Sequence, residues 1–156
     1  MMSPLPAPVR AALAARWPEV FPAEGDLDPN GPLVPADSHY DLAALLKEHG
    51  YLLYVTVVAT HFPTPEGDTF EVATVLRNPS TGKAFWWRCK LGADPVIATL
   101  FPLFAGADWQ EREQFDLVGV RFAGHPDLRR LMLPEDWEGH PLRKSYAIDT
   151  PHAPWR

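Results

Sequence analysis

Proline placement constrains this chain more than any other feature of its sequence. Prolines recur through the first 35 residues, and a second series follows residue 122. A proline fixes φ and lacks an N–H, so it interrupts helices and central strands. We predict a short alanine-rich helix at about residues 9–17, an irregular connector at about 18–35, and an irregular extended arm over residues 123–156.

The segment between these regions alternates helical and strand patterns. A helix over about residues 38–49 places its leucines on one face, starts at a cap supplied by Asp37 or Ser38, and stops at Gly50. Aromatic and β-branched residues predict strands over residues 51–60, 70–77 and 83–91, with a loop at residues 63–67. The Asn-Pro-Ser-Thr-Gly turn at 78–82 joins the last two strands into an antiparallel hairpin.

Four further elements are expected after the hairpin. They are a short helix opened by Asp94-Pro95, a longer helix from Gly106 or Asp108 to a stop at Gly119, a strand near 120–122, and a helical turn near 127–132. The order predicts an α+β domain over residues 1–122, in which helices pack on one face of a small mixed or antiparallel sheet. Residues 123–156 would form a partner-binding arm.

Charge, hydropathy and cysteine content exclude several classes of function. The net charge of −6 argues against general binding to nucleic acid or to anionic lipid. The longest strongly apolar stretch, residues 51–60, is short for a membrane span, which needs about 20 residues. Cys89 is the only cysteine, so this chain alone cannot form a disulfide or a thiolate-rich metal site. Without a secretory signal pattern, we expect an intracellular protein that reaches a membrane only through partners.

The acidic helix at residues 111–116 is the first candidate for a functional site. Paired carboxylates there could perform acid–base chemistry, but that requires a cleft and a shifted pKa, which sequence alone does not show. An ordinary solvated helix with an apolar stripe is the simpler interpretation.

Residues 121–144 offer a second and a third candidate. A metal site could use His125 and His140 with neighbouring acids, although the two histidines are fifteen residues apart and each stands between glycine and proline. Histidines in that setting more simply fix turns. The nearby arginines and Lys144 lack a phosphate-binding loop and are expected to pair with acids. Trp137 stands among acids, as interface anchors and tryptophans at core edges both do.

Residues 108–146 read DWQEREQFDLVGVRFAGHPDLRRLMLPEDWEGHPLRKSY, and this stretch resembles the C subunit of respiratory complex I, NADH–quinone oxidoreductase. Departures from the family pattern are Ser145, where an aspartate is usual, and Val118, where an aromatic residue is common. The family motif and expected partner interface fall on Trp109, Glu111, Arg112, Glu113, Asp116, Gly119, His125, Pro126, Asp127, Arg129, Arg130, Trp137, Gly139, Pro141, Arg143 and Lys144.

The resemblance implies a non-catalytic subunit in the peripheral arm of a proton-translocating oxidoreductase, on the cytoplasmic side of the membrane. It would brace the D subunit, which helps to form the quinone pocket, beside the iron–sulfur subunits. Flavin and clusters would be held by those neighbours and no cofactor by this chain. We also expect the acids and Arg112 of the helix to pair with the basic residues of the arm.

Three alternatives remain at this point. Two are the equivalent subunits of a membrane-bound hydrogenase and of a photosynthetic NDH-type complex, which share the motif. The third, from another class, is a stand-alone metal hydrolase that uses His125 and His140.

Overall fold

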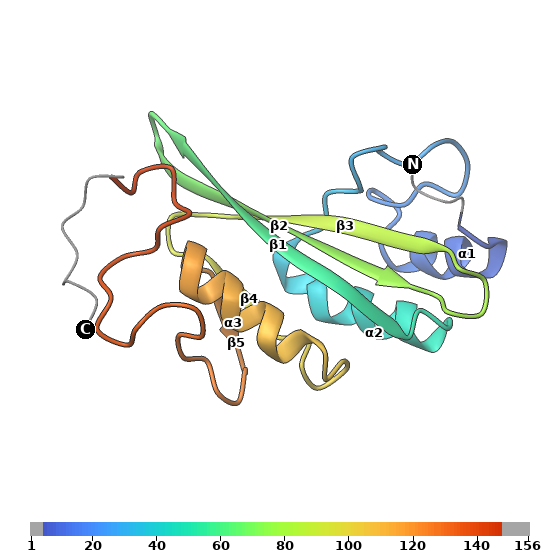
Figure 1. Ribbon diagram of the computed structural model, residues 1–156. Coiled ribbons are helices and arrows are strands. Elements are labelled where there is room, and N and C mark those ends of the chain that lie inside the picture. Colours follow the sequence, from blue (N-terminus) through green and yellow to red (C-terminus); the bar gives the residue numbers. More distant parts are fainter. Residues whose placement is uncertain (1–4, 148–156) are drawn as a thin grey trace.

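The computed structural model describes residues 5–147 and confirms the α+β class. In chain order the elements are α1 (Ala7–Arg16), the 3₁₀ turn η1 (Ala36–Ser38), α2 (His39–Glu48), β1 (Leu53–Thr64), β2 (Gly67–Arg77), β3 (Ala84–Leu91), β4 (Val96–Ala98), α3 (Ala107–Val118) and β5 (Arg121–Ala123). Strands β1, β2 and β3 form an antiparallel meander, whereas β4 and β5 form a separate parallel pair. Figure 1 shows α2 and α3 on one side of the meander.

The predicted hairpin between residues 70 and 91 is confirmed, but the loop expected at 63–67 is wrong. Strand β1 continues to Thr64 and β2 begins at Gly67, so only two residues separate these strands. Pro63 is accommodated because β1 is an edge strand, where a missing N–H leaves no ladder bond unmade.

Alternation along the strands directs one face of the meander into the core. In β3 the side chains of Phe85, Trp87, Cys89 and Leu91 are buried, and the residues between them are more exposed. Helix α2 packs against this face, where Trp87 Nε1 donates a hydrogen bond to His39 Nδ1 at 3.1 Å. Burial lowers the pKa of His39 to about 4, so its ring stays neutral and can accept that bond.

The start of α2 differs from the expected side-chain cap. Ser38 is the N-cap residue, but neither its side chain nor that of Asp37 bonds a helical N–H. The reason is that η1 leads directly into α2, which leaves Ser38 in a helical conformation instead of the extended one that capping requires. The predicted stop is present, since Gly50 has a φ of 87°.

The helix expected after Asp94-Pro95 is also wrong. This segment leads into β4, in which Arg121 N–H donates to Pro95 O and Thr99 N–H donates to Ala123 O, both at 2.9 Å. Pairing with a strand more than twenty residues away therefore overrides the local helix-start signal.

Helix α3 closes the outer edge of β1 with two glutamine side chains. Gln110 Oε1 accepts from Val57 N–H at 3.1 Å, and Gln114 Oε1 accepts from Ala59 N–H at 2.9 Å. Gln110 Nε2 also donates to Val55 O at 3.2 Å. The two amides thus replace part of the ladder that a further strand would supply, and they fix α3 against the sheet.

The connector, residues 17–35, is irregular but reaches the opposite edge of the sheet. Arg88 N–H donates to Pro32 O at 2.9 Å, and Val34 N–H donates to Arg88 O at 2.8 Å. This short pairing lies along β3 and holds the connector on that side of the meander (Figure 1).

Candidate functional site: the α3–arm unit

Helix α3 and the irregular residues 124–147, here called the arm, form one unit that contains the whole predicted motif. The helix ends at Gly119, as expected, and this residue has a φ of 84°. A Cβ at Gly119 would lie 2.5 Å from His140 Cδ2 and would also collide with the guanidinium of Arg143. The helix end thus needs glycine both for its backbone conformation and for the approach of the arm.

Asp116 is the centre of the unit. Its carboxylate is fully buried and accepts backbone N–H groups from Leu131, Met132 and Leu133 at 3.0, 2.7 and 2.9 Å. The other oxygen accepts from Arg130 Nη1 at 2.6 Å. Burial alone would raise the pKa of Asp116, but these hydrogen bonds outweigh it and hold the pKa below its ordinary value.

This arrangement explains why the helical turn expected at residues 127–132 is absent. The N–H groups that a helix would direct along its own axis converge here on the Asp116 carboxylate. Residues 127–132 consequently contain no helix.

Arg130 and Arg143 attach the arm mainly through backbone carbonyl groups. Arg130 Nη2 donates to the carbonyl oxygens of Trp137 and Gly139, each at 2.8 Å. Arg143 Nε donates to the carbonyl of Val118 at 2.7 Å, where helix α3 has unpaired carbonyl groups. A positive group at this end is also favoured by the helix dipole.

Of the pairs expected between the helix and the arm, one forms with direct hydrogen bonding, between Asp116 and Arg130. Arg112 instead lies 3.6 Å from Asp127 and donates to the carbonyl of Arg129 at 3.3 Å. Among residues 5–147, the structure shows no ion pair for Glu113, Arg143 or Lys144. The expectation was wrong there because the arm presents mostly backbone groups to the helix.

Glu111 faces away from the arm and into the fold. Its carboxylate is fully buried and accepts from Thr99 Oγ1 at 2.5 Å and from Leu100 N–H at 2.8 Å. Burial raises the pKa of Glu111 to about 7, and the negative charge of Asp108 acts in the same direction. Because the carboxyl is enclosed, its role is to hold the segment after β4 and not to meet a substrate.

The two histidines of the arm fix backbone turns. His125 Nδ1 accepts from Asp127 N–H at 3.1 Å, and its Nε2 lies 3.3 Å from the carbonyl oxygen of Asp108. His140 Nδ1 lies 2.8 Å from the carbonyl oxygen of Asp116. Burial, with Arg143 and Arg130 nearby, lowers the pKa of His140, so its ring is neutral and donates one N–H.

Comparisons with known proteins agree with the motif. Residues 33–152 match the family described as "Respiratory-chain NADH dehydrogenase, 30 Kd subunit". The chain belongs to this 30 kDa subunit family. It is 37% identical to the C subunit of NADH-quinone oxidoreductase from Moorella thermoacetica, a match that covers 86% of this chain and 90% of the relative.

Further similar proteins differ in how much of the chain they match. The chain is 60% identical over 54 residues to the J subunit of NAD(P)H-quinone oxidoreductase from Synechococcus sp. (strain RCC307), and this segment spans 31% of that protein's length. Among solved structures, the Nqo5 trypsin-resistant fragment has a TM-score of 0.56 at 30% identity, covering 62% of this chain and 80% of the fragment. A chain of the membrane-bound sulfane sulfur reductase, an archaeal respiratory membrane complex, shares the fold, with a TM-score of 0.73 at 21% identity over 90% and 85% of the two chains.

By its family, the chain is related to a subunit of the respiratory-chain NADH dehydrogenase. In the described part of the chain, no helix combines the length and hydropathy needed to cross a bilayer. Residues 148–156 of the predicted arm lie outside the described residues.

The remaining motif residues of this 30 kDa subunit lie on or near its surface. Trp109 is 66% exposed, whereas Trp137 is half-buried. Gly139 takes a φ of 81° where the arm turns beside Tyr146. Three others occupy exposed or half-buried turn positions: Pro126, Arg129 and Pro141.

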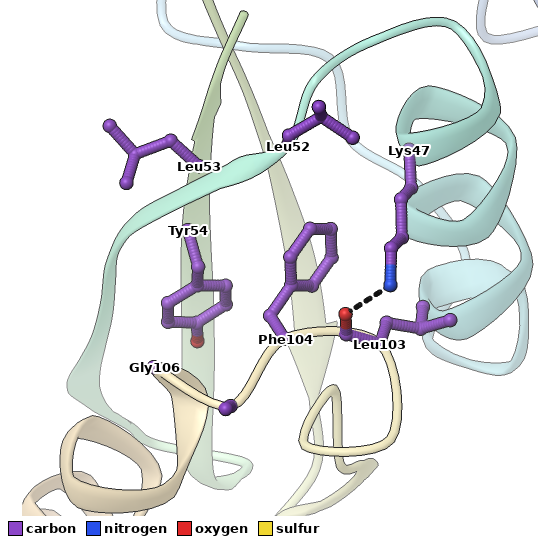
Figure 2. Close-up of a pocket in the computed structure, with 8 residues that line it drawn as sticks. Lys47, Leu52, Leu53, Tyr54, Leu103, Phe104 and Gly106 are labelled. Carbon is purple, nitrogen blue, oxygen red and sulfur yellow. Dashed lines mark hydrogen bonds between the residues drawn. The ribbon is translucent and has the colours of Figure 1, made fainter. Parts of the chain in front are cut away.

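The described residues of the subunit give little support to the enzymatic alternatives. Among them, no group of three His, Cys, Asp or Glu side chains could hold a metal ion. Burial raises the pKa of Cys89 to about 12, so its thiol is not an activated nucleophile. A hollow of about 300 Å³ lies at the start of β1. Figure 2 shows residues that line it, among which Lys47 donates to the carbonyl of Leu103.

Sequence reasoning missed three polar residues that position the unit. Gln110 and Gln114 bond the edge of β1, and buried His61 accepts the N–H of Lys144 at 3.1 Å through Nδ1. No sequence signal distinguishes these glutamines from ordinary helix surface residues. The histidine stands at a core-facing position of a predicted strand flank, which is the one available hint.

Proposed function

We propose that this chain is the non-catalytic C subunit of a proton-translocating NADH–quinone oxidoreductase, in which the α3–arm unit braces the D subunit that helps to form the quinone pocket. It would lie beside the iron–sulfur subunits on the cytoplasmic side of the membrane. The chain would hold no electron carrier, and the flavin and clusters would belong to its neighbours.

One observation carries the proposal. The α3–arm unit holds an irregular chain in a fixed path through buried charged groups, yet it exposes three large apolar side chains. Trp109, Met132 and Leu142 are 66%, 63% and 61% exposed. Large apolar and aromatic groups at such positions are the anchors that protein interfaces bury.

The comparisons favour complex I within this class. The Moorella relative, the C subunit of an NADH-quinone oxidoreductase, matches over 90% of its length. The match to the J subunit of the Synechococcus NAD(P)H-quinone oxidoreductase is stronger in identity but covers 54 residues. An NDH-type complex is therefore the second candidate, supported by that segment.

The test is an affinity pull-down of the tagged full chain from mildly solubilised membranes, analysed by mass spectrometry. We expect recovery of a quinone-pocket subunit together with flavin- and NADH-binding subunits. Recovery with photosynthetic subunits would favour the NDH-type candidate instead. Recovery of the chain alone, while the respiratory complex stays intact, would refute the proposal.

The role of the arm needs a variant with a matched control. Trp109→Ala combined with Leu142→Ala should lower recovery of the quinone-pocket subunit at least tenfold, since interface anchors contribute about 2 kcal/mol or more each. Leu33→Ala removes another large exposed side chain, which lies on the connector, and should leave recovery unchanged. Equal recovery of both variants would show that the arm is not the bracing surface.

A further inference from the structure

Strand β1 exposes a row of large apolar side chains along the length of the sheet. This row, here called the β1 stripe, consists of Leu53, Val55, Val58 and Phe62, with exposed fractions of 49%, 36%, 48% and 41%. Thr56 and Thr60 stand between these apolar side chains. Several large apolar side chains exposed on one face mark a candidate site of interaction.

The stripe lies on the face of the sheet that the core does not use. Val58 stands between the buried Val57 and Ala59, and alternation along the strand turns it to the opposite face. Figure 2 shows the same division at the start of β1, where Leu53 and the buried Tyr54 lie on opposite sides of the strand. The stripe thus faces away from the side on which α2 and α3 pack.

The chain covers the other half of this outer face itself. On β3, Trp86 packs closely against Gly31 of the connector, and Arg88 donates to the carbonyl of Gly31 at 3.0 Å. Arg88 is also paired with Glu71 and Asp28, so its charge is already neutralised. The connector therefore shields the β3 half. On the β1 half, Lys144 lies over the Phe62 ring, and Leu53, Val58 and Phe62 still remain 41–49% exposed within residues 5–147.

The hydrogen bonding and the length of the β1 half indicate which kind of partner element can bind there. The outer edge of β1 has its central backbone groups taken by Gln110 and Gln114, so a partner cannot add a strand there. An occupant must instead lie on the face and present side chains to the stripe. From Leu53 to Phe62 the strand extends about 30 Å, which is the length of a helix of about 20 residues.

Charges at the two ends define the chemistry of that helix. Arg77 is the cross-strand partner of Leu53, and the Lys144 ammonium lies 5.1 Å from the centre of the Phe62 ring. Between these ends, the outward positions of β1 include the uncharged Thr56 and Thr60. The Glu71 carboxylate, across from Thr60 on β2, is paired with Arg88. In a chain with a net charge of −6, an uncharged apolar row with a cation at each end is complementary to an apolar helix face flanked by carboxylates.

We propose that the β1 stripe is a second docking surface, which receives an amphipathic helix of a partner subunit with acidic residues at both ends of its apolar face. This inference rests on the proposed function, because the partner is a neighbour in the same complex. With the α3–arm unit facing one partner and the β1 stripe another element, the chain bridges two parts of the assembly.

Site-specific photo-crosslinking in the assembled complex tests this directly. A benzophenone amino acid is placed at Val58 in the full chain and, in a separate sample, at Trp109, and crosslinked peptides are sequenced by mass spectrometry. We expect the Val58 probe to capture a partner peptide with apolar residues at helical spacing and Asp or Glu at both ends. In pull-downs, Val58→Glu should lower recovery of that same subunit at least tenfold, because it places a carboxylate where the partner helix buries apolar side chains.

The matched control is Val96→Glu, which makes the same change at another strand valine that is 38% exposed. It should leave recovery unchanged. Capture by the Val58 probe of lipid, of a second copy of this chain, or of nothing would overturn the docking inference if the Trp109 probe still captures a subunit of the complex. Failure of both probes in an intact complex would overturn the proposed function as well.

Discussion

Asp116→Asn is the most informative single change in this structure. The substitution keeps the shape of the side chain but removes the charge that three backbone N–H groups and Arg130 share. If the amide oxygen keeps the backbone donors, the amide N–H₂ must face the Arg130 guanidinium, donor against donor. One orientation cannot satisfy both sets of partners.

The magnitude follows from the number and kind of hydrogen bonds that the substitution removes. A hydrogen bond to a charged group contributes about 1.5–3 kcal/mol, and breaking a buried pair costs about 3–5 kcal/mol. These energies do not add, because the arm can detach and so limit the cost to its own docking energy. We expect Asp116→Asn to lower the free energy of unfolding by about 3 kcal/mol.

Urea denaturation and amide hydrogen exchange measure this effect. Wild type and variant are compared at pH 7, and the amides of residues 131–133 should exchange faster in the variant. The control is Glu113→Gln on the same helix, which should change stability by less than about 0.5 kcal/mol. A decrease below about 1 kcal/mol for Asp116→Asn, with unchanged protection of residues 131–133, would refute the central role of this carboxylate.

The same carboxylate gives the wild type an acid-dependent loss of stability. The pKa of Asp116 in the folded state lies below its ordinary value of 3.8, so its contribution is complete above 3.8 and is lost as the pH falls through the folded-state value. Asp116→Asn should remove this part of the acid sensitivity. Denaturation midpoints measured between pH 5 and pH 2 would reveal the difference.

Three further predictions concern other parts of the molecule. Gly119→Ala should lower the melting temperature far more than Gly124→Ala, because both have a φ of 84° but only the former also meets arm side chains within 3 Å. Burial raises the pKa of Glu111 from 4.5 to about 7, so wild type should lose about 3 kcal/mol of unfolding free energy as the pH rises from 4.5 to 8. Glu111→Gln should reduce this pH dependence of stability, measured by urea denaturation. An unchanged pH dependence in the variant would mean that another group causes it. Gln114→Ala should cost about 1 kcal/mol and speed hydrogen exchange at the amide of Ala59, whereas unaltered exchange there would mean that the glutamine does not seal the edge.

Local signals predicted most of the regular structure. The hairpin turn at residues 78–82 and the helix stop at Gly119 follow from glycine and proline chemistry, which acts over a few residues. The segment after Asp94 was wrongly predicted as a helix because its secondary structure depends on pairing with β5, a contact that no local sequence pattern encodes. The hydrophobic periodicity of the sequence does not predict which short strands pair when they are far apart in the chain.

The candidate site was predictable as a set of residues but not as a set of contacts. The motif residues Asp116, Arg130 and Arg143 lie in one α3–arm unit, and their role at a partner interface stays a prediction. The expected side-chain pairs mostly failed because the arm has no regular structure, and its unpaired backbone groups need partners of their own. Charged side chains of the helix and arm therefore form hydrogen bonds mainly with these backbone groups and less with one another.

Because the buried charged side chains bind backbone groups, the path of the arm does not depend on the side chains that the arm exposes to solvent. Asp116 binds amides of the arm, Arg130 binds carbonyls of the arm, and Arg143 binds the carbonyl of Val118 at the end of α3. These backbone groups are present whatever side chains the outward positions carry. Outward residues such as Met132 and Leu142 can therefore drift during evolution together with the surface they meet, without rerouting the chain. Grafting the outward residues of one relative onto another is accordingly a practical route to exchange partner specificity on an unchanged scaffold.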